Sequence, residues 1–167
     1  MKKLYLMVGE PGSGKSTFLK NYQKKVGGVI VSRDEIRFGL LGKNDSYFSK
    51  ENTVFDKYIE SIQNALKNNE IVFADATHIS EGSRMKVLNR LDLTDVEVRP
   101  IVIETSLTTC LANNSTREGL QRVPDQVIKR MFNQFKHPIY DKFHYKEVLT
   151  YFYNTGELTP CQLAKSG

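Results

Sequence analysis

The stretch GEPGSGKST at positions 9–17 constrains the fold of this chain more than any other segment. It matches the phosphate-binding pattern GxxxxGK(S/T) at every fixed position. A short apolar run at 4–8 precedes it and a helix-like run at 18–25 follows it, which is the context that the pattern requires. We therefore predict a loop that binds nucleotide phosphates between the first strand and the first helix.

The residue types of this loop suit a polyphosphate ligand. Gly12 and Gly14 can adopt backbone conformations that turn several N–H groups toward one anion, and the following helix adds the positive end of its dipole. Lys15 is placed to reach the β and γ phosphates of ATP, and the Ser16 hydroxyl is placed to ligate Mg²⁺. The residues expected to bind the nucleotide here are Gly9, Gly12, Ser13, Gly14, Lys15, Ser16 and Thr17.

Composition places the chain among globular proteins. It has 167 residues with 40% hydrophobic and 26% charged, so we expect a single domain over 1–167. The net charge of +5 favours a polyanionic partner, although a nucleotide alone would also favour it. Cys110 and Cys161 have no metal-ligand spacing and are too few for a disulfide framework. With no signal-peptide pattern and no membrane-spanning apolar run, we expect a cytoplasmic protein without a membrane partner.

Strand-like and helix-like runs alternate along the chain. Apolar runs predict strands at 4–8, 29–31, 71–74, 96–103 and 148–153. Helical spacing of apolar residues predicts helices at 18–25, 51–67, 81–91, 108–117 and 125–136. Pro100 suggests that the fourth strand lies near a sheet edge, and no motif is recognisable at 154–167. The order predicts an α/β fold of three layers, with a parallel sheet of about five strands and helices on both faces.

Polar residues follow the second and third predicted strands, where ligands of parallel sheets bind. Asp34, in SRDEIR, is a candidate general base for an accepting hydroxyl; the alternative is that it caps the next helix. Arg37 lies one helical turn further on and could hold an acidic group of the acceptor; the alternative is a solvated arginine. Asp75 could hold Mg²⁺ through water or anchor its loop, and His78 is more typical of a hydrogen-bonded structural residue.

The polar segment at about 108–125 contains Gly119, Arg117 and Arg122. A phosphoryl-transfer enzyme must supply positive charge to the migrating group and exclude water, and a helical lid with arginines can do both. Arg117 is the better candidate because it is expected near the end of a helix; the alternative is an exposed arginine of a connecting loop.

The combination of GxPGSGKST, SRDxIR, DAT and RVPxxVIxRM resembles the polynucleotide kinase type of P-loop kinase, from Leu4 to about Lys136. The resemblance implies a three-layer P-loop kinase fold with a helical lid, ATP and Mg²⁺ as cofactors, and a nucleic acid 5′ end as substrate. By position it implies phosphate and metal contacts for Lys15 and Ser16, a general base at Asp34, acceptor-side roles for Arg37 and Thr77, and ATP contacts for Arg117.

Two departures from the family pattern are visible. Asn113 stands where the family has a second lid arginine, so either Arg122 compensates or the lid binds less strongly. The phage 5′-hydroxyl polynucleotide kinase of this family also carries a separate phosphatase domain with an aspartate-rich motif. This sequence shows no counterpart of that motif, so the resemblance implies a kinase only.

We therefore expect transfer of the γ-phosphoryl group of ATP to a hydroxyl, most simply the 5′-OH of RNA or DNA. The expected catalytic residues are Lys15, Asp34 and Arg117, and the expected substrate-binding residues are Arg37, Asp75 and Thr77. A kinase of a small alcohol or nucleotide remains an alternative, because the same core serves many acceptors. A nucleotide-dependent binding or switch protein is a second alternative, from another functional class. RNA against DNA, ATP against GTP, and the oligomeric state stay open.

Overall fold

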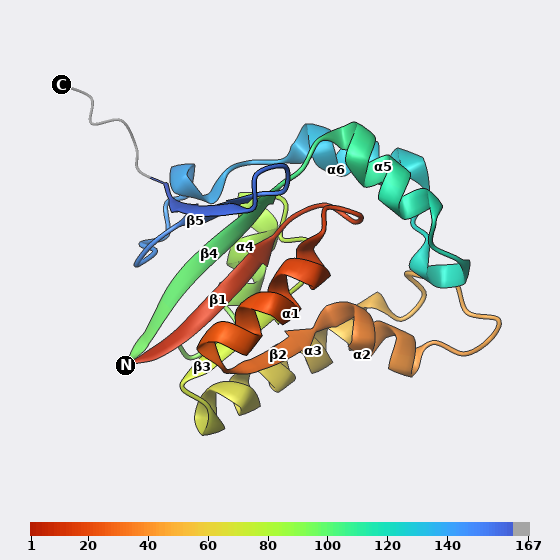
Figure 1. The fold of residues 1–167 in the computed structure, drawn as a ribbon. Helices are drawn as coiled ribbons and strands as arrows, with labels where there is room; N and C mark the ends of the chain where they lie inside the picture. Colours follow the sequence, from red (N-terminus) through yellow and green to blue (C-terminus); the bar gives the residue numbers. More distant parts are fainter. Residues whose placement is uncertain (162–167) are drawn as a thin grey trace.

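The computed structural model describes residues 1–161, in which strands and helices alternate (Figure 1). The strands are β1 (Lys2–Val8), β2 (Val29–Ser32), β3 (Ile71–Asp75), β4 (Val96–Glu104), β5 (Leu149–Phe152) and β6 (Glu157–Pro160). The α-helices are α1 (Lys15–Val26), α2 (Arg33–Leu40), α3 (Glu51–Asn68), α4 (Glu81–Leu88), α5 (Leu107–Ser115) and α6 (Asp125–Gln134). Short 3-10 turns lie at Gly119–Gln121 and Pro138–Tyr140.

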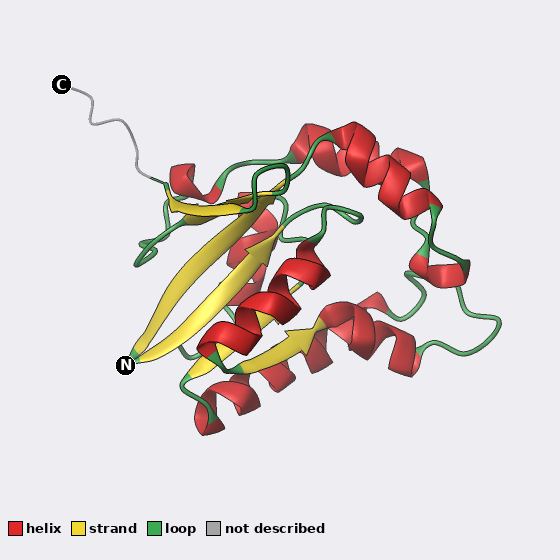
Figure 2. Ribbon diagram, viewed as in Figure 1, coloured by secondary structure: helices red, strands yellow, loops and turns green. Residues whose placement is uncertain are grey.

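The strands form one sheet in the order β2-β3-β1-β4-β5-β6 (Figure 2). β1 is central and pairs in parallel with β3 and β4, and only the last pair, β5 with β6, is antiparallel. Parallel neighbours require crossovers, which the helices provide. The carboxyl ends of β1, β2 and β3 therefore lie at the same edge of the sheet, as the sequence predicts.

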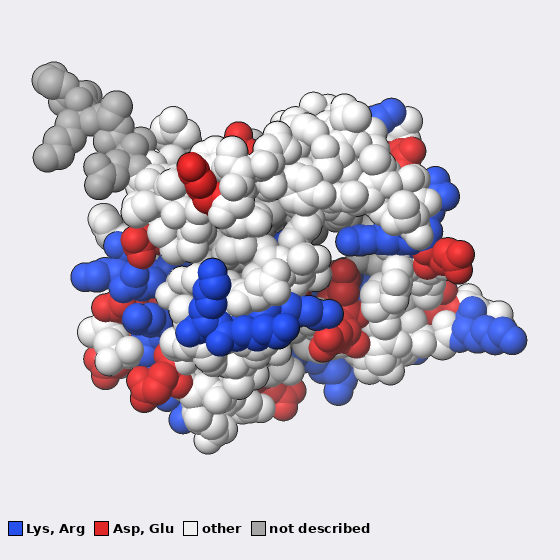
Figure 3. Space-filling view, in the orientation of Figure 1, with Lys and Arg blue, Asp and Glu red and all other residues white. Residues whose placement is uncertain are grey.

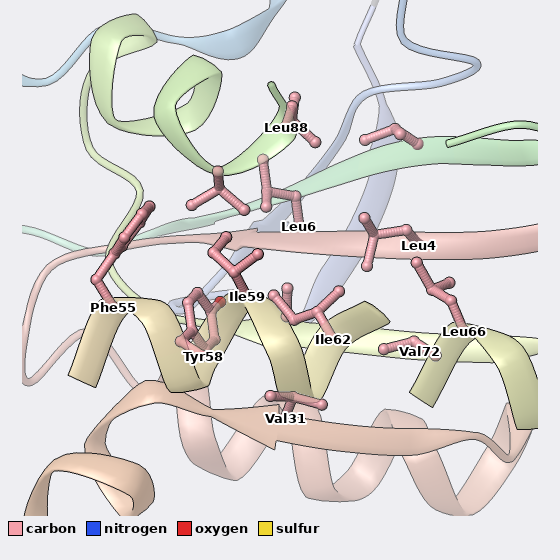
Figure 4. Close-up of a cluster of buried hydrophobic side chains, with 13 residues drawn as sticks. Leu4, Leu6, Val31, Phe55, Tyr58, Ile59, Ile62, Leu66, Val72 and Leu88 are labelled. Atoms are coloured by element: carbon pink, nitrogen blue, oxygen red, sulfur yellow. The ribbon is translucent and has the colours of Figure 1, made fainter. Parts of the chain in front are cut away.

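Alternating side chains of β1 build two cores, one on each face of the sheet. Leu4 and Leu6 point toward α3 and α4, where they pack among buried residues such as Ile62 and Leu88 (Figure 4). Tyr5 and Met7 point to the opposite face and belong to a cluster that includes Phe18 and Leu19 of α1. The predicted three-layer α/β fold is thus confirmed.

One expectation about the sheet is wrong. β4 lies inside the sheet, between β1 and β5, although Pro100 suggested an edge. β5 pairs with β4 only from Ile101 onward, so before that point one side of β4 needs no ladder hydrogen bond and tolerates a proline. The sheet also has a sixth strand, β6, in the segment where the sequence shows no motif.

Some helix boundaries also differ from the predicted ones. α4 ends at Leu88 and not at 91, and α5 runs from Leu107 to Ser115, which leaves Arg117 just beyond its end. The single domain over 1–167 stays a prediction, and residues 162–167 lie outside the described part of the chain. Over the residues that are described, no helix is both long and apolar enough to cross a membrane.

A buried ion pair fixes the loop after β3. The side chains of Arg84 and Asp141 are fully buried, and two hydrogen bonds of 2.6 and 2.7 Å join them. Arg84 also donates to the backbone carbonyls of His78 and Lys136, at 2.7 and 2.9 Å. Tyr145 donates to Asp141 at 2.8 Å. Because every strong polar group here has a partner, α4, the loop after β3 and the segment before β5 are held as one unit.

We expect Arg84→Met to lower the free energy of unfolding by about 3–5 kcal/mol, because the variant leaves Asp141 buried without its counter-charge. Urea denaturation measures the loss. Arg90→Met is the matched control: its ion pair with Asp56 is exposed on both sides, so we expect a change below about 1 kcal/mol. Equal losses in the two variants would contradict a structural role for the buried pair.

Candidate active site

The loop between β1 and α1 has the backbone that its glycines predict. Gly12 and Gly14 have φ angles of +81° and +90°, in the left-handed region that favours glycine. Gly14 is the N-cap of α1, so the helix begins at Lys15 with its free N–H groups directed at the loop. These are the conformations and dipole that an anion-binding loop needs.

Helix α5 presses against the outer side of this loop. A Cβ atom at Gly12 would lie 2.3 Å from the carbonyl oxygen of Cys110. The side chain of Asn113 donates to the carbonyl of Gly12 at 2.8 Å, and Thr105 donates to the carbonyl of Ser13 at 2.5 Å. Asn113, which stands where the resemblance expects an arginine, therefore holds the loop backbone. Because these side chains bind two carbonyl groups of the loop, the loop backbone is held in place before any ligand binds.

A pocket of about 320 Å³ opens beside the loop and brings together most of the predicted site residues. The loop and α1 contribute residues 13–17, α2 contributes Asp34 and Arg37, the end of β3 contributes Asp75 and Thr77, and the lid contributes Arg117. Figure 3 shows the molecule hollowed between the lid and the part that carries α2, with charged side chains of both signs around the hollow. Gly9, Gly12 and Arg122 are not among the lining residues.

Gly9 does not line the pocket, but it connects two of the loops that do. The N–H of Gly9 donates to the carbonyl of Thr77 at 3.0 Å, which ties the phosphate loop to the loop after β3. Arg122 is exposed on the lid. The contact of Arg122 with the nucleotide, which would compensate for Asn113, stays a prediction.

Lys15 and Asp75 meet at the centre of the pocket. The ammonium nitrogen of Lys15 lies 3.0 Å from one carboxylate oxygen of Asp75, and that oxygen is buried without a hydrogen bond among the described residues. Asp75 and Ser16 both line this pocket, and Mg²⁺ is typically held by one or two carboxylates together with water and substrate phosphates, so these two residues could hold the ion.

Asp34 lies in the first turn of α2, but it does not cap the helix. The cap is Ser32, whose hydroxyl accepts a hydrogen bond from the N–H of Glu35 at 3.2 Å. The carboxylate of Asp34 is 56% exposed and accepts hydrogen bonds at one oxygen from Arg37 and from the hydroxyl of Tyr47, the latter at 2.9 Å. The alternative that Asp34 serves as the helix cap is therefore wrong.

Arg37 is buried, not a solvated surface arginine. Its Nε and one terminal nitrogen donate to Glu51 at 2.8–3.2 Å, and its other terminal nitrogen donates to Asp34 and, at 2.8 Å, to Tyr47. A guanidinium group has five N–H donors, and these partners occupy them. An acceptor phosphate would have to displace one of them, so the predicted contact of Arg37 with the acceptor stays a prediction.

Glu51 is one of the residues of this site that the sequence did not reveal; Tyr47, Phe48 and Met131 are others. It begins α3 and bridges Arg33 and Arg37, so two carboxylates and two guanidinium groups alternate beside the pocket. Burial raises the pKa of Tyr47, which keeps its hydroxyl protonated as a donor to Asp34. A glutamate at a helix start is an ordinary feature, and no local signal links it to residues 14 and 18 positions earlier.

His78 is structural. It is 3% exposed, with a φ of +45°, and its ring nitrogens contact the carbonyl of Met7 at 2.7 Å and the hydroxyl of Tyr58 at 3.3 Å. Burial lowers the pKa of His78 to about 3, so the ring is neutral at physiological pH. The histidine joins the loop after β3 to β1 and α3, which supports the position of Asp75 and Thr77.

Comparison with known proteins gives one family and several relatives. Residues 4–138 match the protein family described as the AAA domain. The L-seryl-tRNA(Sec) kinase of Methanococcus maripaludis is 30% identical over 140 residues, which cover 81% of this chain and 53% of that protein. A protein of Acanthamoeba polyphaga mimivirus named for a bifunctional polynucleotide phosphatase/kinase is 26% identical, over 94% of this chain and 35% of its own length. This chain thus spans about half of the length of the first relative and about a third of the length of the second.

Solved structures share the fold. One in the Pnkp1/Rnl/Hen1 RNA repair complex has a TM-score of 0.67 at 20% identity, over 99% of this chain and 50% of that one. A fungal RNA kinase has a TM-score of 0.58 at 10% identity, and the match covers 99% of this chain and 78% of that kinase. A gluconokinase from Sinorhizobium meliloti 1021 has a TM-score of 0.55 at 13% identity, and the match covers 89% of this chain and 82% of the gluconokinase. Identities this low establish a common fold and do not select an acceptor.

We expect Gly12→Ala to weaken ATP binding at least about tenfold, because the added Cβ both requires a strained positive φ and collides with α5. Titration with a fluorescent ATP analogue measures the affinity. Gly39→Ala is the matched control: nothing lies within 4 Å of a Cβ at this exposed position of α2, so it should bind ATP normally. Normal ATP binding by Gly12→Ala would contradict the proposed tight packing of the loop.

Proposed function

This chain belongs to the AAA domain family, and we propose that it is a P-loop kinase of the polynucleotide kinase type, which transfers the γ-phosphoryl group of ATP to the 5′-hydroxyl of RNA or DNA. One observation carries the proposal. The same pocket holds Lys15 of the phosphate loop and the exposed carboxylate of Asp34, so a hydroxyl can lie between a phosphate chain and a proton acceptor.

Each group has a part in this reaction. The loop N–H groups and Lys15 bind the β and γ phosphates. Asp34 orients the hydroxyl and takes its proton through the carboxylate oxygen that Arg37 and Tyr47 leave free. The hydroxyl oxygen then bonds to the γ-phosphorus while the bond from that phosphorus to the bridging oxygen breaks, which releases ADP. Arg117 supplies positive charge to the migrating group from the lid.

Mg²⁺ would be held by Ser16 and, through water, by Asp75, and it would neutralise charge on the phosphates. Thr77 lines the same pocket, and its hydroxyl would contact the acceptor.

A second candidate acceptor is the hydroxyl of a small group carried on tRNA. It is favoured by the relative from Methanococcus maripaludis, whose name specifies seryl-tRNA and which is more similar in sequence than the viral relative. A switch protein is less well supported, because it gives the cluster of Asp34, Arg37 and Glu51 no shared purpose.

Incubation with Mg²⁺, labelled ATP and a panel of acceptors tests the proposal. The panel contains 5′-hydroxyl RNA and DNA oligonucleotides, seryl-tRNA, nucleosides and gluconate. We expect label on the 5′ ends of oligonucleotides. Label on seryl-tRNA alone would establish the second candidate, and label on gluconate alone would contradict both.

Variants of the two central residues separate binding from transfer. We expect Asp34→Ala to lower the transfer rate by about 10²–10⁴-fold while ATP affinity stays within about twofold, because the carboxylate acts on the acceptor. Lys15→Ala should lower both. Glu35→Ala is the control, since Glu35 is the exposed neighbour outside the pocket lining. A large loss of ATP affinity in Asp34→Ala would count against its role as base.

Glu51→Gln should lower kcat/KM for the acceptor by about 10- to 100-fold, because both arginines lose a carboxylate partner and Asp34 is no longer held in place. ATP affinity should not change. Glu60→Gln, an exposed carboxylate of the same helix, is the matched control. Steady-state kinetics with varied acceptor measure the effect, and an unchanged kcat/KM would show that Glu51 is dispensable.

A further inference from the structure

The loop between α2 and α3 brings two adjacent aromatic side chains to the pocket, and the proposed reaction uses neither ring. Tyr47 and Phe48 both line the pocket that contains Asp34. Tyr47 is partly buried, whereas the Phe48 side chain is 51% exposed. An isolated exposed phenylalanine is unremarkable, but this one borders the acceptor side of a polar pocket.

The Phe48 ring is held by its neighbours. Its centroid lies 4.5 Å from that of Tyr47 with the planes at 79°, an edge-to-face pair. Phe38 packs edge-on against Tyr47 at 6.2 Å, and the guanidinium carbon of Arg37 lies 4.3 Å from the Tyr47 ring centroid and 5.8 Å from that of Phe48. Tyr47 and Arg37 therefore hold the Phe48 ring in position, and the rest of the ring is exposed to solvent.

The same contacts link this surface to the chemistry of the pocket. The hydroxyl of Tyr47 donates to Asp34, and its ring contacts Phe48. A group that rests on Phe48 is thereby placed relative to the carboxylate that we propose as the base. Met131 of α6, which follows the lid, adds a partly buried apolar side chain to the same pocket.

A flat, exposed aromatic ring beside a hydroxyl-acceptor site suits a planar ligand. Base stacking on an aromatic side chain is favourable for every nucleobase and tolerant of sequence. A linear polyol such as gluconate has no flat face to stack. The neighbouring Arg37 lies at cation–π distance from both rings and helps to fix their position.

We propose that Phe48 is a stacking site for the nucleobase of the nucleotide that carries the accepting 5′-hydroxyl. This inference rests on the proposed function and narrows it, because it makes the base, and not only the sugar and phosphate, part of the recognised substrate. It assigns a specificity role to the loop at 41–50.

The experiment compares Phe48→Ala, Phe48→Trp and the unaltered protein on two 5′-hydroxyl oligonucleotides. One carries a normal 5′-terminal nucleotide and the other an abasic one. For the normal oligonucleotide we expect Phe48→Ala to raise KM about tenfold or more and Phe48→Trp to keep it low. For the abasic oligonucleotide, KM should already be high in the unaltered protein and should not rise further in Phe48→Ala.

Phe132→Ala is the matched control, since Phe132 is 38% exposed on α6 and does not line the pocket. It should leave both KM values unchanged, and ATP affinity and thermal stability should be unchanged in all variants. If Phe48→Ala raises KM equally for both oligonucleotides, or for neither, the stacking site is refuted while the proposed function stands. If the unaltered protein labels no oligonucleotide, the proposed function itself fails and this inference fails with it.

Discussion

The close contact between α5 and the phosphate loop is the constraint on which the rest of this structure depends. Gly12 passes so near the carbonyl of Cys110 that no side chain fits, and Asn113 and Thr105 bind the loop carbonyls from the same side. α5 forms the first part of the lid and ends two residues before Arg117, so the element that braces the loop also positions Arg117 at the pocket. Phosphate binding and lid placement are thus parts of one packing arrangement.

A second level of organisation is electrostatic. Asp34 and Glu51 alternate with Arg33 and Arg37, so the cluster is neutral in total and each charge has a partner of opposite sign. Such pairing limits the cost of placing a reactive carboxylate beside other charges. It also leaves Asp34 as the exposed member, free to meet a substrate, whereas Arg37 is nearly enclosed.

The fold alone does not choose the acceptor, because an RNA kinase and a gluconokinase share it. Selectivity must therefore come from side chains added to the common sheet edge. In this chain the loop at 41–50 and the start of α3 bring Tyr47, Phe48 and Glu51 to the pocket that contains the proposed base. Differences in acceptor among such kinases are expected to follow this loop more than the phosphate loop.

By itself the sequence determined the features whose information is local: the strand, glycine loop and helix around Lys15, the order of strands and helices, and the edge where Asp34 and Asp75 emerge. Only the tertiary structure decided what depends on partners far along the chain. It placed Pro100 inside the sheet, added β6, gave the helix cap to Ser32, enclosed Arg37 and brought Glu51 to it. A backbone turn is encoded by the residues within it, whereas a salt bridge or a sheet neighbour is set by packing between segments that the local pattern does not connect.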